Sequence, residues 1–257
     1  MLKELNFEYY DTVDSTNERI KERARAGASQ GLIISAGTQT AGKGRIGRKW
    51  ESPSHDSIST SILLHPKELT LESVPTITII AAMAVRKALE ITCGLEGLIK
   101  WPNDIVLDGK KICGILTEME IKDGKPWYVT CGIGVNVHNT SFPEEIAFKA
   151  TSVDLQLRHN GSTKKGSRKE ITHAIWQCFR DYYNIFIKTG DLAGLKEEYE
   201  RHLANRGERV RIEAQADSYE ATAVGITHRG ELIVNTQGEE RIIRAGEVSV
   251  RGIYGYV

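Results

Sequence analysis

The longest apolar segment of the chain, Val74–Ile91 (VPTITIIAAMAVRKALEI), places the strongest constraint on its fold. Pro75 falls in the first turn, where a helix accepts proline, so the segment predicts one long apolar helix. Short apolar or alternating runs on both sides of it predict strands, at Phe7–Val13, Gly31–Ala36, Ser57–Leu64, Leu98–Trp101, Asp104–Leu107, Lys111–Ile121 and Trp127–Val137. Asp108-Gly109 between two of these strands predicts a hairpin turn. Together they predict an α+β domain with a sheet and flanking helices.

The remaining segments complete this outline. Ser15 with Glu18 three residues later has the form of a capping box and predicts a helix through about Ala26. Further helices are expected at Ser167–Lys188 and Leu192–Ala204, and a loop at Asn139–Ala150.

From Gly207 the pattern changes to short alternating strands, with turns expected at Asp217-Ser218, Arg229-Gly230 and Gln237-Gly238. Such a stretch predicts a small β-barrel appended to the α+β domain. We therefore expect two domains, residues 1–205 and 206–257.

Composition narrows the class of protein. Among 257 residues, 34 Lys and Arg balance 34 Asp and Glu, so net charge favours neither nucleic acid nor a membrane surface as a partner. The N-terminus has no signal-peptide pattern, and no apolar run approaches the roughly 18 residues of a membrane-spanning helix. The four cysteines lack any CxxC pair and the histidines lack metal-ligand spacing. Reduced thiols, a cytoplasmic location and no bound structural metal are the simplest expectation.

Positive charge is concentrated in one segment, Gly37–Trp50 (GTQTAGKGRIGRKW), which we call the basic loop. It contains four cations among closely spaced glycines and no acidic residue. Glycine allows the backbone to approach a ligand closely and cations favour an anionic one, although a solvated surface loop would have a similar composition.

Two phosphate-binding motifs are nearly matched in the basic loop and can be set aside. Gly37-x4-Gly42-Lys43 begins like a P-loop, but Gly44 stands where Ser or Thr should hold Mg²⁺. Gly42-x-Gly44-x-x-Gly47 fits the dinucleotide pattern. Both motifs must open into a helix, and the following residues, RKWESPSHDS, contain Pro53 and no helical period.

Four motifs in order carry a family resemblance: DSTN from Asp14, the basic loop, KWPND followed by KKICGIL from Lys100 to Leu116, and GIGVN from Gly132. Together they resemble the biotin protein ligases. The resemblance implies a catalytic domain like that of class II aminoacyl-tRNA synthetases, followed by an SH3-like barrel. It also implies an ATP-dependent ligase that makes biotinyl-5′-AMP and passes biotin to a lysine of a biotin carboxyl carrier protein.

The resemblance implies roles for individual residues. The expected biotin-binding set is Ser15, Thr16, Asn17, Gln39, Lys43, Gly44, Arg45, Lys111, Gly114, Gly132 and Gly134. The expected ATP and adenylate set is Arg45, Trp50, Asn103, Asp104, Lys111 and Asn136, with Mg²⁺ arriving as part of the ATP co-substrate. Lys111 and Arg45 are the expected catalytic cations, because two anions must meet in the first step.

Several of these assignments have alternatives. Lys110 competes with Lys111, and since neighbouring strand residues face opposite sides, only one of them can enter the site. Trp50 could pack near adenine or serve as a core residue, and Asp104 could be a turn residue after Pro102.

Two departures from the family pattern matter. The family often has GRGR where this chain has GKGR, so Lys43 keeps the charge but loses the bidentate fork of arginine. DSTN begins at Asp14, which leaves no room upstream for the DNA-binding domain of some relatives, so we expect a ligase without a repressor function. The family also makes a homodimer an expectation.

Two other functions compete with the ligase. A lipoate ligase or acyl-carrier transferase would share the fold but not the basic loop joined to KWPND. A nucleic-acid-binding module would need a basic face with stacking aromatics, and the segment 207–257 has few aromatics and many acids.

Overall fold

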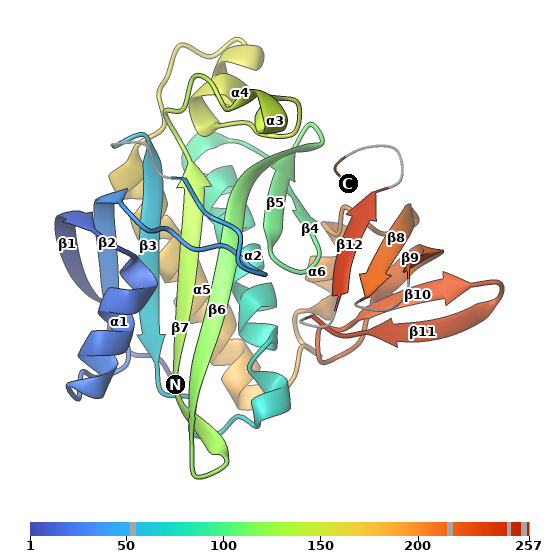
Figure 1. Ribbon diagram of the computed structural model, residues 1–257, viewed down its shortest axis with the longest axis horizontal. Helices are drawn as coiled ribbons and strands as arrows, with labels where there is room; N and C mark the ends of the chain where they lie inside the picture. Colours follow the sequence, from blue (N-terminus) through green and yellow to red (C-terminus); the bar gives the residue numbers. More distant parts are fainter. Residues whose placement is uncertain (52–54, 215–217, 246–247, 253–255, 257) are drawn as a thin grey trace.

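The computed structural model describes residues 1–51, 55–214, 218–245, 248–252 and 256. A seven-stranded mixed sheet forms its larger part, in the order β1-β2-β3-β7-β6-β5-β4. A five-stranded antiparallel sheet in the order β11-β10-β9-β8-β12 lies beside it (Figure 1). The expected α+β fold with a small C-terminal β domain is confirmed.

The strands of the large sheet are β1 (Asn6–Val13), β2 (Leu32–Gln39), β3 (Ser57–Leu64), β4 (Leu98–Lys100), β5 (Asp104–Leu107), β6 (Lys110–Lys122) and β7 (Lys125–Asn136). The helices are α1 (Thr16–Arg25), α2 (Thr76–Cys93), α3 (Glu144–Ala147), α4 (Val153–His159), α5 (Arg168–Thr189) and α6 (Lys196–Arg201), with a 3-10 turn at Leu71–Ser73. The small sheet contains β8 (Arg209–Ala214), β9 (Ser218–Ile226), β10 (Leu232–Thr236), β11 (Glu239–Ile243) and β12 (Val248–Gly252).

Helices cover both faces of the large sheet. Helices α2 and α5 pack against one face and against each other, whereas α1 lies on the opposite face over β2, β3 and β7 (Figure 1). The apolar segment predicted as a long helix is α2, most of whose residues are buried. The basic loop leaves β2 and crosses the same face as α1, in front of β7 and β6 (Figure 1). This face therefore receives α1, the basic loop and the two longest strands together.

Most predicted elements are present, with ends shifted by a few residues. Ser57–Leu64 and Asp104–Leu107 have the predicted bounds. Asp108 and Gly109 have φ of 48° and 71°, as a two-residue hairpin turn with both central residues left-handed requires. β2 continues to Gln39 because it pairs in parallel with β1 as far as Val13↔Gln39. A strand, β3, follows the basic loop, as expected, and no helix intervenes among the described residues.

Two predictions from the sequence were wrong, and one helix was missed. The loop expected at Asn139–Ala150 contains the short helix α3, and α4 after it was missed. The helix expected over Leu192–Ala204 is only Lys196–Arg201. The ends of that segment pair elsewhere, since the Leu192 N–H donates to His228 O at 2.8 Å and the Ala204 N–H to Ile99 O at 2.9 Å. Tertiary pairing thus shortens the helix at both ends.

The capping box at the start of α1 does not form. Ser15 occupies the N-cap position, but its side chain makes no capping hydrogen bond. The Glu18 carboxylate, which a capping box would turn back onto the Ser15 N–H, accepts hydrogen bonds from Lys21 and Lys43 instead. Both side chains of the predicted cap are therefore available for other partners.

The small sheet packs closely against the large one. The Trp101 indole N–H donates to Gly230 O at 2.9 Å, and buried residues of both sheets belong to one apolar cluster. The predicted turns at Arg229-Gly230 and Gln237-Gly238 are present, whereas Asp217 of the third lies outside the described residues. A division at residues 205 and 206 stays a prediction. Among the described residues, none of the helices is both long and apolar enough to cross a bilayer.

Candidate active site

The basic loop forms a small hairpin lying across the sheet. The Gly44 N–H donates to Arg48 O at 2.7 Å and the Trp50 N–H donates to Gly42 O at 3.0 Å. Ile46 and Gly47, with φ of 54° and 68°, make the turn. Because its own backbone groups are paired, the hairpin can be held over the sheet as a unit by its side chains.

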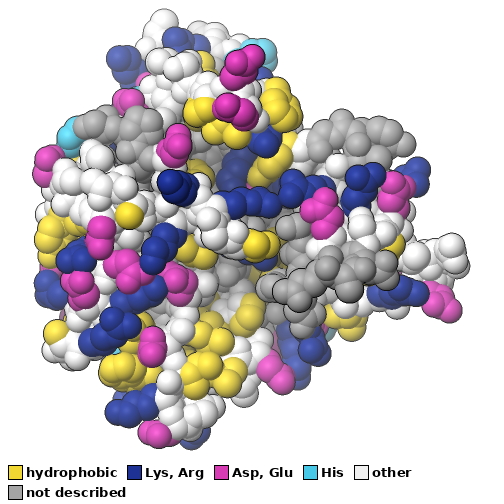
Figure 2. Space-filling model, in the orientation of Figure 1, with side chains coloured by type: hydrophobic (Ala, Val, Ile, Leu, Met, Phe, Trp, Pro, Cys, Tyr) yellow, Lys and Arg dark blue, Asp and Glu magenta, His cyan; other side chains and the backbone are white. Residues whose placement is uncertain are grey.

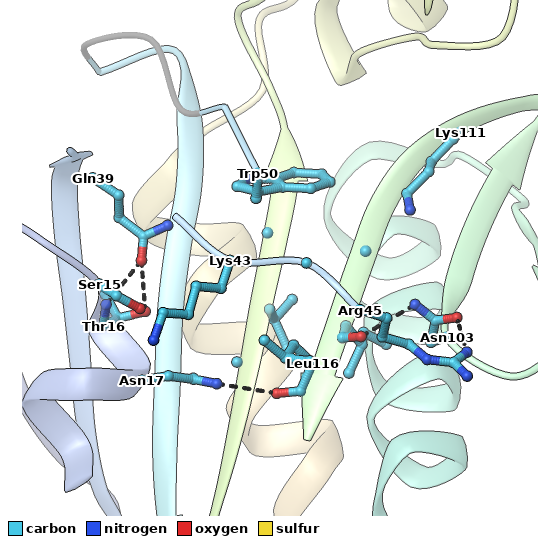
Figure 3. Close-up of a pocket in the computed structure, with 16 residues that line it drawn as sticks. Ser15, Thr16, Asn17, Gln39, Lys43, Arg45, Trp50, Asn103, Lys111 and Leu116 are labelled. Carbon is cyan, nitrogen blue, oxygen red and sulfur yellow. Dashed lines mark hydrogen bonds between the residues drawn. The ribbon is translucent and has the colours of Figure 1, made fainter. Parts of the chain in front are cut away.

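A cavity lies between this hairpin and the sheet, with a free volume of about 490 Å³ that includes its open mouth. The part of it open to water-sized molecules is only about 60 Å³, below the roughly 300–1,000 Å³ common for small-molecule sites, so a ligand would need the side chains of the hairpin to move aside. Most of the residues predicted for the two binding sets line it (Figure 3), namely Ser15, Thr16, Asn17, Gln39, Lys43, Gly44, Arg45, Trp50, Asn103, Lys111, Gly114, Gly132 and Gly134. Residues far apart in the sequence thus meet in one place.

One end of the cavity is lined by short polar side chains. Gln39 Oε1 accepts hydrogen bonds from the Thr16 N–H and hydroxyl, at 2.8 and 3.1 Å. The Ser61 hydroxyl on β3 lies 2.6 Å from Thr16 Oγ1 and 2.7 Å from Asn17 Oδ1. Ser61 was not predicted, because none of the quoted motifs includes β3. The network fixes the orientation of amide and hydroxyl groups suited to a polar, uncharged ring.

Glycines on β6 and β7 make room for two of the larger side chains. A Cβ on Gly132 would lie 2.4 Å from Asn17 Oδ1, and one on Gly134 would lie 2.4 Å from Trp50 Cε2. On Gly114 it would meet both Trp50 and Lys111, at 3.1 Å. Gly132 and Gly134 therefore exclude any larger residue as long as Asn17 and Trp50 keep their places, whereas a Cβ on Gly114 would need only a small shift of its neighbours.

The Trp50 indole lies over this glycine floor with its N–H buried and without a hydrogen-bond partner among the described residues. An unpaired buried donor is costly, and the Trp50 side chain lines the cavity. This favours a site role for Trp50 over that of a core residue, since a bound molecule could accept the hydrogen bond.

The other end of the cavity is cationic. Lys111 Nζ lies 2.6 Å from Asp104 Oδ1, and Arg45 donates to Asn103 Oδ1 at 2.8 Å. Burial lowers the pKa of the Arg45 guanidinium, which shows that its charge is poorly solvated. Lys110, the alternative to Lys111, is exposed and does not line the cavity. Asp104 lies behind Lys111 and does not itself line the cavity.

Two residues outside the predicted binding sets lie beside this end without lining the cavity. Lys100 is 6% exposed, and its ammonium lies 3.6 Å from the centre of the Tyr256 ring. The Tyr256 hydroxyl donates to Asp104 Oδ2. Burial lowers the pKa of Lys100 to about 8, which the nearby Asp104 only partly opposes. Lys100 belongs to KWPND, so the motif pointed to it, whereas Tyr256 follows from tertiary structure alone.

The cations outnumber the acids here. Arg45, Lys100 and Lys111 surround one carboxylate, that of Asp104. Figure 2 shows Lys and Arg side chains in a row across this face, between the large sheet and the small one. Such a surplus of poorly solvated positive charge favours anionic ligands.

Two predicted residues are placed differently from expectation. The Asn136 side chain is buried, donates to Thr151 O at 3.0 Å and does not line the cavity. Lys43 lines the cavity, but its ammonium turns away from the cationic end and lies 2.6 Å from Glu18 Oε1 (Figure 3). The charge of Lys43 is therefore already paired.

The cavity wall also contains three apolar residues outside the predicted binding sets, Ile115, Leu116 and Ile133, although all three lie within the quoted motifs. They belong to β6 and β7, and only the strand pairing places them at the cavity. Among the described residues, no group of three or more His, Cys, Asp or Glu side chains could hold a metal ion.

Comparison with known proteins agrees with this geometry. The Biotin/lipoate A/B protein ligase family matches residues 9–136, and the Biotin protein ligase C terminal domain matches residues 207–251. The Bifunctional ligase/repressor BirA of Bacillus spizizenii is 33% identical over 244 residues, which cover 94% of this chain and 73% of that protein. The Biotin--[acetyl-CoA-carboxylase] ligase of Mycobacterium tuberculosis is 29% identical, with 91% of this chain and 85% of that one covered.

Solved structures show the same likeness in three dimensions. The biotin protein ligase of Aquifex aeolicus in complex with biotin and ATP superposes with a TM-score of 0.82 at 30% identity, covering 96% of this chain and 99% of that one. The match therefore spans the large sheet, the site and the small sheet together. With the motif order, the cavity and the full-length relatives in agreement, this chain belongs to the biotin protein ligase family.

Proposed function

We propose that this chain activates biotin with ATP, forming biotinyl-5′-AMP and pyrophosphate, and then transfers biotin to the acceptor lysine of a biotin carboxyl carrier protein. It is an ATP-dependent ligase. In the first step a biotin carboxylate oxygen attacks the α-phosphorus and pyrophosphate leaves. In the second, the lysine amine attacks the acyl carbon and AMP leaves.

One observation carries the proposal: the cavity has an uncharged polar end and a cationic end, with the basic loop spanning both. Biotin has the matching polarity, a polar ureido ring at one end and a carboxylate at the other. Thr16, Asn17 and Gln39 suit the ring, since their amide and hydroxyl groups are already oriented. The carboxylate would then lie beside Lys111 and Arg45.

The cationic end supports the chemistry of the first step. A carboxylate and a triphosphate repel each other, and fixed cations in a poorly solvated site reduce that repulsion. Lys111 faces the carboxylate and the α-phosphate, with Asp104 fixing its ammonium. Arg45 and Asn103 face the nucleotide, and Mg²⁺ enters with ATP as part of the co-substrate. Trp50 covers the adenylate and offers its indole N–H.

The basic loop suits the second step. A mixed anhydride is hydrolysed by water, so a loop that closes over the adenylate protects it until the carrier arrives. The Mycobacterium tuberculosis relative is named for acetyl-CoA carboxylase, which supports a subunit of that enzyme or a similar carboxylase carrier as the partner. We place the reaction in the cytoplasm, where the four free cysteines would stay reduced. A homodimer stays a prediction.

The test is a pyrophosphate-release assay with biotin, lipoate or octanoate supplied in turn. We expect pyrophosphate release when biotin is supplied and none with lipoate or octanoate. Release with lipoate or octanoate instead would identify an acyl ligase of the other branch, and no release with any acid would refute the proposal. Mass spectrometry of a supplied carrier domain tests the transfer step, with an increase equal to one biotinyl group on its acceptor lysine expected.

A further inference from the structure

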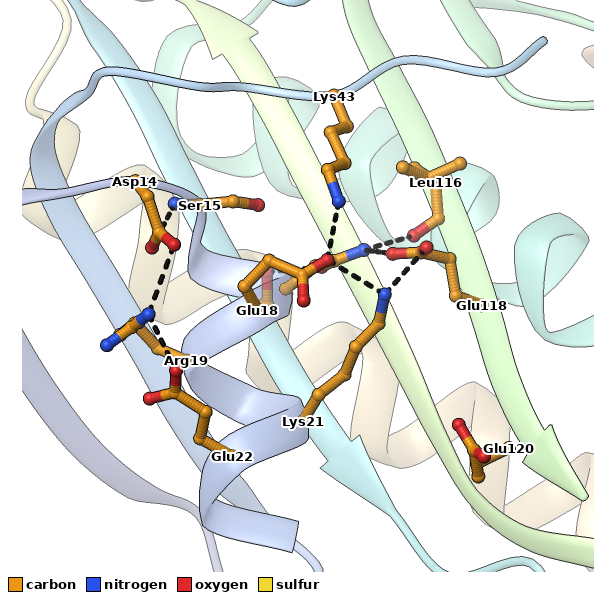
Figure 4. A network of polar contacts seen from close by, with 12 residues as sticks. Asp14, Ser15, Glu18, Arg19, Lys21, Glu22, Lys43, Leu116, Glu118 and Glu120 are labelled. Atoms are coloured by element: carbon orange, nitrogen blue, oxygen red, sulfur yellow. Dashed lines mark hydrogen bonds and ion pairs between the residues drawn. The ribbon is translucent and has the colours of Figure 1, made fainter. Parts of the chain in front are cut away.

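The basic loop is joined to the polar end of the cavity by a network of charges that the proposed reaction does not use. Lys43 Nζ lies 2.6 Å from Glu18 Oε1, and Lys21 Nζ lies 3.0 Å from the same oxygen. Lys21 also lies 2.8 Å from Glu118 Oε1, and the other oxygen of Glu118 accepts from Asn17 Nδ2 at 2.8 Å (Figure 4). The order is cation, anion, cation, anion, amide.

We propose that Glu18 is a positioning residue that holds the basic loop closed through Lys43, and that Glu118 extends this link to Asn17. The inference rests on the proposed function, because Asn17 is expected to bind the biotin ring. Loop closure and the orientation of a ring-binding amide would then be one coupled event.

The local structure of α1 supports this role for Glu18. Its sequence position predicts a capping carboxylate, yet Ser15 makes no capping bond and Glu18 points to Lys21 and Lys43. The Lys43 ammonium holds the pKa of the Glu18 carboxyl below its usual value, so the carboxylate is charged at neutral pH. The Glu18 side chain therefore binds Lys43 of the basic loop and does not cap its own helix.

The two lysines of the network differ in their exposure to solvent. Lys21 is 16% exposed, while Lys43 is 50% exposed. Lys21 therefore forms the fixed centre, held between Glu18 and Glu118, and Lys43 is the solvent-facing end that docks onto it. Because Lys21 already holds the Glu18 carboxylate in place, the docking of Lys43 orders only the Lys43 side chain.

The start of the loop is anchored by its backbone, since the Thr40 N–H donates to Val13 O and the Ala41 N–H to Asp14 O. Beyond Lys43, two other side chains of the hairpin contact the sheet side of the cavity, and the three contacts have different chemistry. Arg45 donates to Asn103 at the cationic end, and Trp50 lies on Gly134. An entering nucleotide would break these two contacts or change their partners. The Lys43–Glu18 pair lies outside the cationic end, so it can persist while ATP binds and while pyrophosphate leaves.

Lysine at position 43 also fits this task. A contact with one carboxylate oxygen uses the point charge of lysine and does not require the planar fork of arginine. The substitution that separates GKGR from GRGR thus coincides with a single-oxygen contact to Glu18.

The experiment measures release of preformed biotinyl-AMP from the purified chain, together with KM for biotin and kcat for adenylate formation. Variants are Glu18→Gln, Lys43→Gln and their double. Exposed ion pairs contribute up to about 1 kcal/mol, so each single variant should release the adenylate roughly two- to fivefold faster, with kcat little changed in Glu18→Gln. The double variant should be no faster than either single one. Glu118→Gln should raise KM for biotin as well.

The matched control is Glu22→Gln, which removes a carboxylate from the same helix. Glu22 pairs with Arg19 at 2.7 Å, away from the basic loop, so release should match the wild type. Thermal unfolding of each variant separates loss of the fold from loss of the loop contact. Additive effects of Glu18→Gln and Lys43→Gln, or release unchanged in both, would overturn the inference. Absence of any adenylate in the wild type would instead overturn the proposed function.

Discussion

Replacing Lys111 with alanine tests the electrostatic basis of the first step. The Lys111 side chain is 27% exposed and its ammonium is fixed 2.6 Å from Asp104. Two unit charges about 4 Å apart interact by about 4 kcal/mol at an effective dielectric constant of about 20. The residual solvent at the cavity mouth reduces this to about 3–4 kcal/mol of lost stabilisation in the transition state. The expected loss in rate is therefore about two to three decades.

The assay is single-turnover formation of biotinyl-AMP, quenched at timed intervals, with saturating biotin and ATP. Saturation separates the chemical step from weaker binding. Lys110→Ala is the matched control, because this neighbouring lysine is exposed and does not line the cavity. Its rate should stay within about threefold of the wild type, as expected of a solvent-screened charge.

Lys111→Met keeps the length of the side chain and should be as slow as Lys111→Ala, because charge and not volume is lost. If Lys110→Ala is the damaging change, the assignment of the catalytic lysine is wrong. If Lys111→Ala slows adenylation by less than about tenfold, the ammonium of Lys111 does not supply the main stabilisation of charge in the transition state.

Three further predictions concern the floor, the loop and the charge of the site. Gly134→Ala would put a Cβ 2.4 Å from Trp50, so adenylate formation should fall by at least about tenfold; Gly194→Ala, whose Cβ would meet nothing closer than 3.5 Å, is the control and should match the wild type in the same assay. Arg45→Gly should release the adenylate faster with little change in thermal stability. The release is measured as biotin attached to the lysines of a bystander protein, and unchanged retention of the adenylate would contradict a role for Arg45 in closing the loop. The Lys100 ammonium, with a pKa of about 8, is lost as the pH rises through that value, so KM for ATP should rise above pH 8 in the wild type. Lys100→Arg stays charged and should flatten that profile; parallel profiles would exclude Lys100 from ATP binding.

The sequence predicted the order of elements in the large domain well, because periodicity and turn residues act locally. Asp108-Gly109 is an example, since two left-handed residues in a row identify the hairpin without any tertiary information. The prediction failed where backbone N–H groups donate to carbonyl groups that are distant in the sequence. The sequence predicts a helix from Leu192 to Ala204, yet the N–H groups of these two residues donate to the carbonyl oxygens of His228 and Ile99.

The candidate site was predicted from motifs to a similar extent. Four separated motifs supplied most of the cavity lining, but they did not indicate two supporting residues, Ser61, which contacts Thr16 from β3, and Tyr256, which donates to Asp104. Asn136 is a polar residue within a motif, but its amide donates to Thr151 O and it does not line the cavity. A motif gives the positions along the chain, but not the direction in which each side chain points.

By itself the sequence determined that the chain folds as an α+β domain with a small β domain, and that a glycine-rich basic loop leads into a strand. These follow from residue periodicity and from the conformations that glycine allows. Tertiary structure alone decided which partner each charge takes. Glu18 could cap its own helix, but the basic loop brings Lys43 within 2.6 Å, and a full positive charge attracts the carboxylate more strongly than a backbone N–H does.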